Sequence, residues 1–285
     1  MLLYKYLKYE RKELFETGLI RFTQPKYFND PFEALPFVEN ILSPEFVSEI
    51  IPVLSNKKQV DIITNELNNQ DTKNTFKELY LTFQRSNSTE QEKIKKRLLG
   101  ISKDDLSKVM QSYWSDQIGI LSLSEENDNL TMWSHYADEH EGFVVGFNPI
   151  KNITDIKTQF IHLKKIHYSC KRPNLSLFGL EQKTSERNKQ WLKAFFLTKS
   201  KDWSYENEWR QVNMLKYANN IKDNNFGLIY LFKYNIESIE SVLLGCNMLP
   251  ENRKEIINMI KNLNIKIYEM RINKNNYSLD KVRIN

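Results

Sequence analysis

The chain has 285 residues, of which 40% are hydrophobic and 12% aromatic, and this globular composition excludes an intrinsically disordered protein. A net charge of +5, from 41 Lys and Arg against 36 Asp and Glu, is compatible with nucleic acid or a phosphate-bearing ligand but too small to indicate either. The two cysteines, Cys170 and Cys246, are too few for a disulfide framework or a four-ligand zinc site.

The first part of the chain predicts two strands around a helix. Residues 2–7 form the first predicted strand, residues 8–18 a helix that ends at a glycine, and residues 19–25 a second strand that ends at a proline. Residues 26–36, KYFNDPFEALP, predict a turn-rich loop, because Asn and Asp before Pro favour turns and Pro cannot continue a strand ladder. Over residues 41–115, apolar residues at helical spacing predict a helical insertion, which could be a lid, a specificity element or a scaffold.

Strands dominate the rest of the chain. Period-two and continuous apolar patterns predict strands over residues 118–124, 142–148, 159–169, 226–234, 239–245 and 265–272, and helical spacing predicts helices over residues 129–142, 185–202 and 250–263. We therefore expect an α+β fold with a mixed, mostly antiparallel β-core. It would form a single domain over residues 1–285, with the helical insertion within it.

The apolar segments and the number of cysteines indicate the cellular location of the protein. The N-terminal segment has too short an apolar run for a signal peptide, and no stretch approaches the roughly 20 apolar residues that cross a bilayer. With so few cysteines, a reducing compartment is expected. The sequence thus predicts a soluble, cytoplasmic protein without a membrane partner.

A first candidate site lies in the stretch KDWSYENEWRQV, from Lys201 to Val212. Aromatic and polar residues alternate, which predicts a strand that carries Glu206, Glu208 and Arg210 on one face. Two neighbouring carboxylates raise each other's pKa, and Arg210 partly offsets this effect. Such a pair could stabilise a developing cation or bind a metal. The alternative is a solvent-exposed ladder of Glu and Arg without a catalytic role.

Three further groups of residues are candidates. Hydroxyl, phenol and imidazole groups between residues 122 and 136 suit a polar ligand such as a ribose or an amide. The candidate residues are Ser122, Ser124, Trp133, His135 and Tyr136. The aromatic ones among them could instead be core residues. The loop NDPFE offers Asn29, Asp30 and Glu33, as turn residues or as acids in a cleft. Lys5 and Arg21 are candidate phosphate partners.

Several common signatures are missing from the sequence. It contains no G-x-G-x-x-G and no P-loop, so neither standard phosphate cradle is present. It also lacks H-E-x-x-H, C-x-x-C and G-x-S-x-G, and its four scattered histidines argue against zinc. No metal ligands are therefore assigned.

The motifs NDPFE, MWSHYADEHEGF and K-x-x-x-W-x-Y-E-x-E-W-R, taken in order, resemble a bacterial domain-of-unknown-function family, family 2971. The resemblance extends over nearly the whole chain. Some members of that family lie near phage-defence and mobile-element genes, which implies a role as a bacterial toxin or phage-defence effector.

The order of three elements is also similar to that of ADP-ribosyltransferases: a first strand, a Ser/Tyr segment, and a late Glu-x-Glu. This similarity implies a split β-core and NAD as the substrate. In that reading Glu208 stabilises the oxocarbenium-like state formed when the nicotinamide–ribose bond breaks, and Glu206 orients the acceptor. The residues that would bind NAD are Lys5, Tyr6, Arg21, Ser122, Ser124, Trp133, His135, Tyr136 and Arg210. The first strand offers Lys5 where those enzymes place Arg or His.

Two other functions stay open. A metal-dependent nuclease or phosphodiesterase would use Asp30, Glu33, Glu206 and Glu208 around Mg²⁺. A non-catalytic sensor would bind a regulatory partner protein through the helical insertion. For the transferase, the partners are a nucleotide or dinucleotide ligand and an acceptor that is protein, nucleic acid or water.

Overall fold

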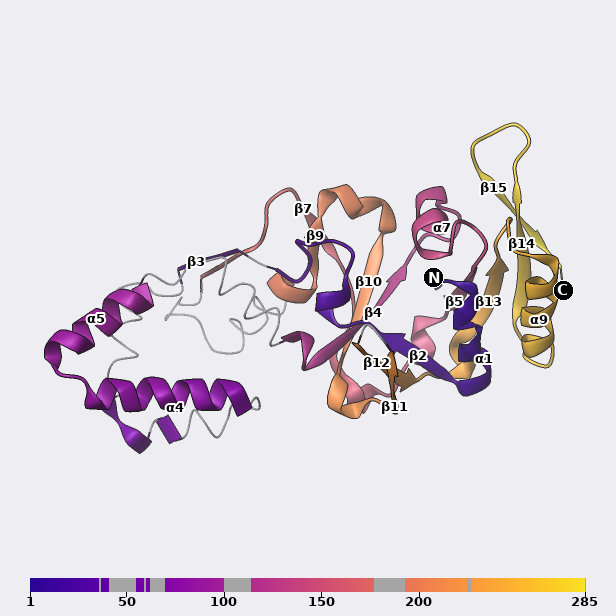
Figure 1. Cartoon of the computed structure of the whole chain (residues 1–285). Coiled ribbons are helices and arrows are strands. Elements are labelled where there is room, and N and C mark those ends of the chain that lie inside the picture. The colour runs from indigo at the N-terminus through magenta and orange to yellow at the C-terminus, as the bar shows by residue number, and fades with distance from the viewer. Residues whose placement is uncertain are drawn as a thin grey trace. The chain divides into compact units, whose positions relative to one another are not determined.

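The computed structural model describes residues 1–35, 37–40, 55–58, 60–61, 70–99, 114–176, 193–224 and 227–284. The chain divides into two compact units (Figure 1). The first unit comprises Met1–Glu33, Trp114–Lys171 and Phe196–Asn285, and the second comprises Ala34–Tyr113 and Arg172–Phe195. No helix among the described residues is both long enough and apolar enough to cross a membrane.

The first unit is built on an eight-stranded sheet. Its strands lie in the order β15 (Leu279–Arg283), β14 (Lys266–Ile272), β13 (Ile239–Leu244), β5 (Phe143–Phe147), β1 (Leu3–Leu7), β4 (Ile118–Ser124), β10 (Glu208–Met214) and β6 (Gln159–Lys165). All neighbours are antiparallel except β13 and β14, between which the chain passes through helix α9 (Pro250–Ile260). The expected mixed, mostly antiparallel β-core is confirmed.

The sheet is nearly separated between β1 and β4. Five residue pairs join β1 to β5, whereas Tyr4 and Ser124 are the one pair that joins β1 to β4. Farther along β4, Thr23 pairs with Ile120 instead. Thr23 follows β2 (Leu19–Phe22), which belongs to a three-stranded sheet with β12 (Gly227–Lys233) and β11 (Asn220–Asn224). The chain therefore opens a gap beside β4, and this gap positions the site described below.

Helices cover both faces of the large sheet. Leu3, Phe143 and Val145 face a core that includes α9 and the short helix α1 (Glu13–Thr17). The opposite face packs Tyr6, Val144 and Leu243 against helix α7 (Leu130–Tyr136). This alternation of inward and outward residues along each strand is what burial of both faces requires.

The turn between α7 and β5 has an unusual backbone. Asp138, Glu139 and His140 all have positive φ angles, between 51° and 71°. Gly142 immediately precedes β5, and a Cβ there would lie 2.2 Å from the carbonyl oxygen of Leu7. Because the obstacle is backbone, only glycine fits at this position. The motif DEHEG therefore encodes a left-handed turn that connects α7 to the sheet.

Several expected elements are confirmed, and three differ from the prediction. The predicted strand over residues 159–169 is two strands, β6 and β7 (His167–Ser169), and β7 pairs in parallel with β9 (Thr198–Ser200) in a separate small sheet. The predicted strand over Trp203–Arg210 begins only at Glu208, because Lys201–Glu206 forms a 3₁₀ helix. Of the helix expected over residues 185–202, residues 185–192 lie outside the described residues, residues 193–196 are helical, and Thr198–Ser200 forms the strand β9 instead. Strands β11 and β15 were not expected from the sequence.

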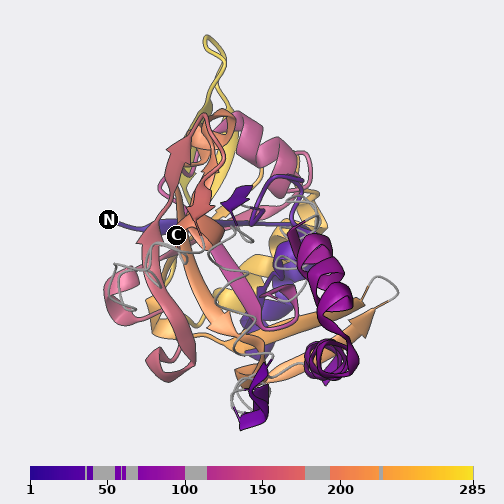
Figure 2. The same ribbon diagram turned by 90° about the vertical axis from the view of Figure 1, so that its left-hand side faces the viewer.

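The β14–β15 hairpin ends in a loop that extends away from the rest of the first unit in both views (Figures 1 and 2). Tyr277 in this loop is fully exposed.

The second unit contains a parallel strand pair and helices. Strand β3 (Phe37–Asn40) pairs with β8 (Asn174–Ser176). Helices α4 (Gln70–Arg85) and α5 (Ser88–Leu99) follow, and Figure 2 looks nearly along the axis of α4. Asn87 and Glu90 exchange hydrogen bonds at the start of α5, as in a capping box. Within the expected helical insertion over residues 41–115, residues 41–54, 59, 62–69 and 100–113 lie outside the described residues, and the prediction of one domain with this insertion stays a prediction.

Candidate functional site

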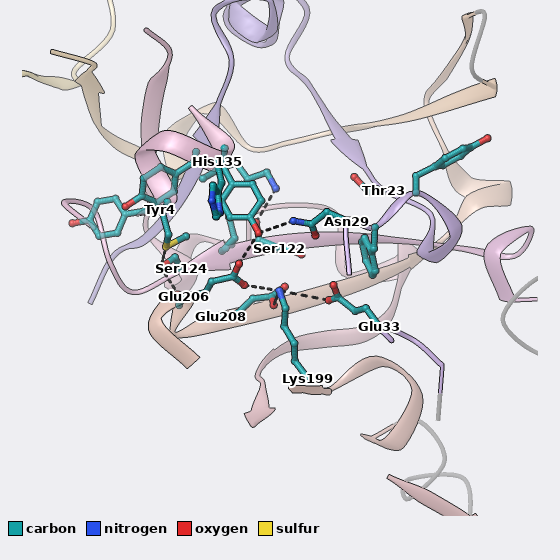
Figure 3. Close-up of a pocket in the computed structure, with 17 residues that line it drawn as sticks. Tyr4, Thr23, Asn29, Glu33, Ser122, Ser124, His135, Lys199, Glu206 and Glu208 are labelled. Carbon is teal, nitrogen blue, oxygen red and sulfur yellow. Dashed lines mark hydrogen bonds and ion pairs between the residues drawn. The ribbon is translucent and has the colours of Figure 1, made fainter. Parts of the chain in front are cut away.

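A cavity of about 360 Å³ opens where β1 separates from β4. Side chains from β1, β4, α7, the loop over residues 27–33 and the segment Lys199–Glu208 line it (Figure 3). These segments are far apart in sequence, so the cavity exists only in the folded first unit. Its volume is at the lower end of the range of about 300–1,000 Å³ that is typical of small-molecule sites.

A buried ion network forms the floor of the cavity. The ammonium nitrogen of Lys199 lies 2.5 Å from Glu206 Oε2, 3.2 Å from Glu208 Oε2 and 3.8 Å from Glu33 Oε1. Figure 3 shows the three carboxyl groups turned toward this ammonium. Arg210 completes the network, since its Nε and Nη2 donate to the two oxygens of Glu208 at 2.7 and 3.0 Å, and its Nη2 also contacts Glu33. None of these side chains is more than 6% exposed.

Burial and charge act against each other in this network. Burial alone would lower the pKa of Lys199, but the charges of Glu208 and Glu206 outweigh it and raise that pKa. Burial raises the pKa of Glu208, and Lys199 opposes that shift. Burial lowers the pKa of Arg210, and the charge of Asp30 opposes the shift. Lys199 is therefore a protonated cation at neutral pH and not a nucleophile.

The backbone around Asn207 brings the two glutamates together. Ser200 accepts a hydrogen bond from the Asp202 N–H at the start of the 3₁₀ helix, which ends at Glu206. Asn207 then takes a left-handed conformation, with φ 43° and ψ 50°, and β10 begins at Glu208. The expectation that Glu206 and Glu208 share one strand face is thus wrong. They nonetheless converge on Lys199, because the turn at Asn207 reorients the chain between them.

Glu206 is the carboxylate that α7 contacts. Tyr136 donates its phenol proton to Glu206 Oε1 at 2.6 Å, and Asn29 donates to the Tyr136 oxygen at 3.2 Å. Burial raises the pKa of Tyr136, and the Glu206 charge adds to the shift. Behind it, the Ser124 hydroxyl donates to the carbonyl oxygen of Glu206 at 2.5 Å. These bonds hold the side chain and the backbone of Glu206 at once.

Lys5 spans the gap in the sheet. Its ammonium donates to the carbonyl oxygen of Ser122 at 2.9 Å, where no backbone pairing joins β1 to β4. Burial lowers the pKa of Lys5 to about 8, while the charge of Glu208 opposes this shift. Among the described residues the ammonium makes no other hydrogen bond, which leaves two of its three N–H groups for a ligand in the cavity.

Most of the residues expected from the sequence line the cavity, namely Lys5, Tyr6, Asn29, Glu33, Ser122, Ser124, His135, Tyr136, Glu206 and Glu208. Arg210 lies beneath the floor and contacts Glu208 instead. Asp30 is buried and accepts a hydrogen bond from the Phe32 N–H, so it stabilises the loop turn. Arg21 lines a neighbouring cavity.

Trp133 does not line the cavity, although we expected it to bind a ligand. It is fully buried, packs edge-on against Tyr6 at 5.6 Å between ring centroids, and donates to the Asn127 carbonyl. The Trp133 ring packs entirely within the core, and its N–H group has a backbone partner. This is the alternative that the sequence left open, in which Trp133 is a core residue.

The sequence did not identify Lys199, which is the centre of the network. It opens the motif K-x-x-x-W-x-Y-E-x-E-W-R, so a signal existed, but no spacing rule places it beside residues seven and nine positions later. Tyr168 was also missed. Its hydroxyl accepts a hydrogen bond from the Glu208 N–H at 2.8 Å. The aromatic side chains of Tyr27 and Phe28 add further wall area.

The arrangement suits a ligand that develops positive charge. Three carboxylates, those of Glu33, Glu206 and Glu208, lie at the buried floor, and aromatic rings and Lys5 also line the cavity. Within the part of the chain that the structure describes, no group of three or more His, Cys, Asp and Glu side chains could hold a metal ion. Here the carboxylates are in contact with Lys199 and Arg210, which occupy the positions that a divalent cation would need.

Comparison with known proteins finds a match to one family model, and that match indicates no activity. No curated protein and no solved structure matches the chain. A family model described as "Protein of unknown function (DUF2971)" matches residues 132–211, a shorter stretch than the nearly complete match we expected. That stretch includes residues 132–136 of α7, Lys199, Glu206 and Glu208, but not β1, β4 or Glu33. The resemblance to family DUF2971 is therefore confirmed over residues 132–211 of this chain.

Proposed function

We propose that the cavity binds the nicotinamide and its ribose in NAD, and that the protein cleaves the bond between the nicotinamide and this ribose, as an ADP-ribosyltransferase does. The observation that supports this proposal is the position of Glu206. Its carboxylate lies at the cavity floor, ionically paired to Lys199 and hydrogen-bonded to Tyr136. A fixed negative charge in a closed site stabilises a developing cation far better than one in water.

The chemistry would proceed as follows. The bond between ribose C1′ and the pyridinium nitrogen breaks, and its electron pair moves to that nitrogen, so neutral nicotinamide leaves. The ribose becomes oxocarbenium-like, and the Glu206 carboxylate stabilises this charge. A water, protein or nucleic-acid nucleophile then bonds to C1′ and releases its proton to solvent. The Tyr136 ring would stack on the nicotinamide.

The contacts favour Glu206 over Glu208 for the charge-stabilising role. Both oxygens of Glu208 accept hydrogen bonds from Arg210, and one of them also accepts from Lys199. Glu206 Oε1 is held by the Tyr136 phenol, which a ribose hydroxyl could replace. In the proposal Glu206 therefore contacts the substrate, and Glu208 is a positioning residue for Lys199. This exchanges the roles that the motif order implied.

The two other functions have less support. A metal-dependent nuclease would need several carboxylate oxygens free to coordinate one divalent cation, and here Lys199 and Arg210 contact those oxygens. A partner-binding role for the second unit, and a role as a toxin or phage-defence effector, stay predictions that no contact described above favours.

A direct assay tests the proposal. The purified protein should release nicotinamide from NAD, measured by chromatography, and Glu206→Gln should slow the release about 10²–10³-fold, because it removes the charge but keeps the shape. Glu125→Gln is the matched control. Glu125 is a partly exposed carboxylate that contacts Lys165 and does not line the cavity, so its change should leave the rate unaltered. Equal rates for the wild type and Glu206→Gln would refute the assigned role of Glu206.

A further inference from the structure

A second, smaller cavity adjoins the first one. It has a volume of about 130 Å³ and lies among β1, α1, β2, β11 and β12. Lys5 and Thr23 line both cavities, so the two cavities lie next to each other. A ligand in the first cavity could extend past Lys5 into the second.

The second cavity is rich in positive charge. Four cations line it, Lys5, Arg11, Arg21 and Lys222, against two carboxylates, Glu10 and Glu13. Glu13 is in contact with Lys222, at 2.6 Å between the ammonium and Oε2. Glu10 offsets one further positive charge, so an excess of two charges is shared among Lys5, Arg11 and Arg21.

Arg21 lines this cavity and has one donor without a partner in the part of the chain that the structure describes. Its Nε is shielded from solvent and has no hydrogen-bond partner among the described residues. Burial lowers the pKa of Arg21, and the charge of Arg11 adds to the shift. Burial lowers the pKa of Lys5 as well, and there the charge of Arg21 contributes. Clustered cations that lower one another's pKa are stabilised by a bound anion.

We propose that the second cavity is a phosphate subsite, in which Arg21 binds the diphosphate of a dinucleotide whose nicotinamide ribose occupies the first cavity. The guanidinium presents planar, paired donors that match phosphate oxygens. Lys5, between the two cavities, contacts the phosphate nearer the ribose, and Arg11 lies at the exposed rim. This inference rests on the proposed function for the identity of the ligand, but phosphate binding can be tested alone.

The probe is inorganic pyrophosphate, which carries the phosphate groups without a ribose. Isothermal titration calorimetry with the full-length protein should show binding at low salt, and Arg21→Gln should weaken it about tenfold or more, because one charge-assisted contact is lost. Arg21→Lys, which keeps the charge but loses the paired donors, should be intermediate. Lys157→Gln removes one exposed charge outside both cavities and should leave the affinity unchanged.

Arg11 provides a second variant in case Arg21→Gln does not fold. It is exposed, so Arg11→Gln should fold normally and weaken pyrophosphate binding by a smaller factor. Pyrophosphate affinity that is unchanged in both Arg21→Gln and Arg11→Gln would overturn the subsite. Equal weakening by Lys157→Gln would also overturn it, because binding would then depend on net charge alone.

The two proposals fail in different ways. If the wild type cleaves NAD and Arg21→Gln leaves the KM for NAD unchanged, the phosphate subsite is wrong and the proposed function stands. If pyrophosphate binds through Arg21 but nicotinamide is never released, the subsite stands and the proposed reaction is wrong.

Discussion

At the scale of single residues, Lys199 has the greatest consequences for the site. Its ammonium is the only cation that contacts Glu33, Glu206 and Glu208 together among the described residues. Bringing three carboxylates into a buried floor is unfavourable unless their charge is compensated. Lys199 and Arg210 supply that compensation, so the geometry of the cavity floor and the stability of the first unit depend on the same contacts.

Lys199→Met tests this dependence. The change keeps most of the side-chain volume but leaves buried carboxylates with one cation fewer, which typically costs about 3–5 kcal/mol. Urea unfolding should show this loss in the free energy of unfolding. Lys165→Met is the matched control: Lys165 pairs with Glu125 at 2.8 Å but is half exposed, so its loss should cost about 0–1 kcal/mol. Equal losses in the two variants would contradict the network.

The stability deficit of Lys199→Met should also depend on pH. Burial raises the folded-state pKa of Glu208, so this group contributes most to stability at low pH, and its contribution is lost as the pH rises through that pKa. Without Lys199 the pKa rises further, and protonation relieves the buried charge. The deficit measured by urea unfolding should therefore be smaller near about pH 5 than near about pH 8. A deficit that grows toward acid pH would contradict this assignment.

The sequence predicted the acidic residues of the site better than their partners. Glu206 and Glu208 stand out in a short motif, and both reach the floor. Lys199 and Tyr136 contact Glu206 from other elements, so their pairing depends on how the chain folds back. Arg210 was expected to bind a ligand, but its full burial makes it a support for Glu208.

At the scale of elements, the junction at Asn207 decides where the carboxylates point. Asn207 is left-handed, its side chain donates to Glu126 at 2.7 Å, and its carbonyl accepts from the Glu125 N–H. The alternation of aromatic and polar residues indicated a strand through this point. A 3₁₀ helix that ends in a left-handed residue forms here in place of the strand, because Ser200 caps the helix and Asn tolerates a positive φ.

A pair of substitutions isolates the backbone effect. Asn207→Gly and Asn207→Ala both remove the amide contact with Glu126, but only alanine resists the left-handed conformation. Asn207→Ala should therefore be less stable than Asn207→Gly by about 1 kcal/mol in thermal or urea unfolding. It should also slow nicotinamide release more, since a relaxed turn would displace Glu206. An alanine variant as stable and as active as the glycine variant would show that the turn is not needed.

At the scale of the whole molecule, local pattern predicted most strands of the first unit but not their order. Strand β1 lies between β5 and β4, and β4 pairs with β10, which begins 84 residues after β4 ends. Such long-range pairing is set by packing of both sheet faces, which a single sequence does not reveal. The gap between β1 and β4 is a consequence of that pairing. Its two adjoining cavities could therefore not be predicted.

The central claim is that one ligand lies across this gap, with its nicotinamide ribose at Glu206 and its diphosphate at Arg21. A crystal structure of the protein with an NAD analogue, in which a carbon replaces the ring oxygen of the nicotinamide ribose, tests it most directly. This analogue cannot form an oxocarbenium ion and should stay intact. We expect the ribose hydroxyls within hydrogen-bond distance of Glu206 and the diphosphate between Lys5 and Arg21. An analogue bound elsewhere, with both cavities empty, would contradict the account.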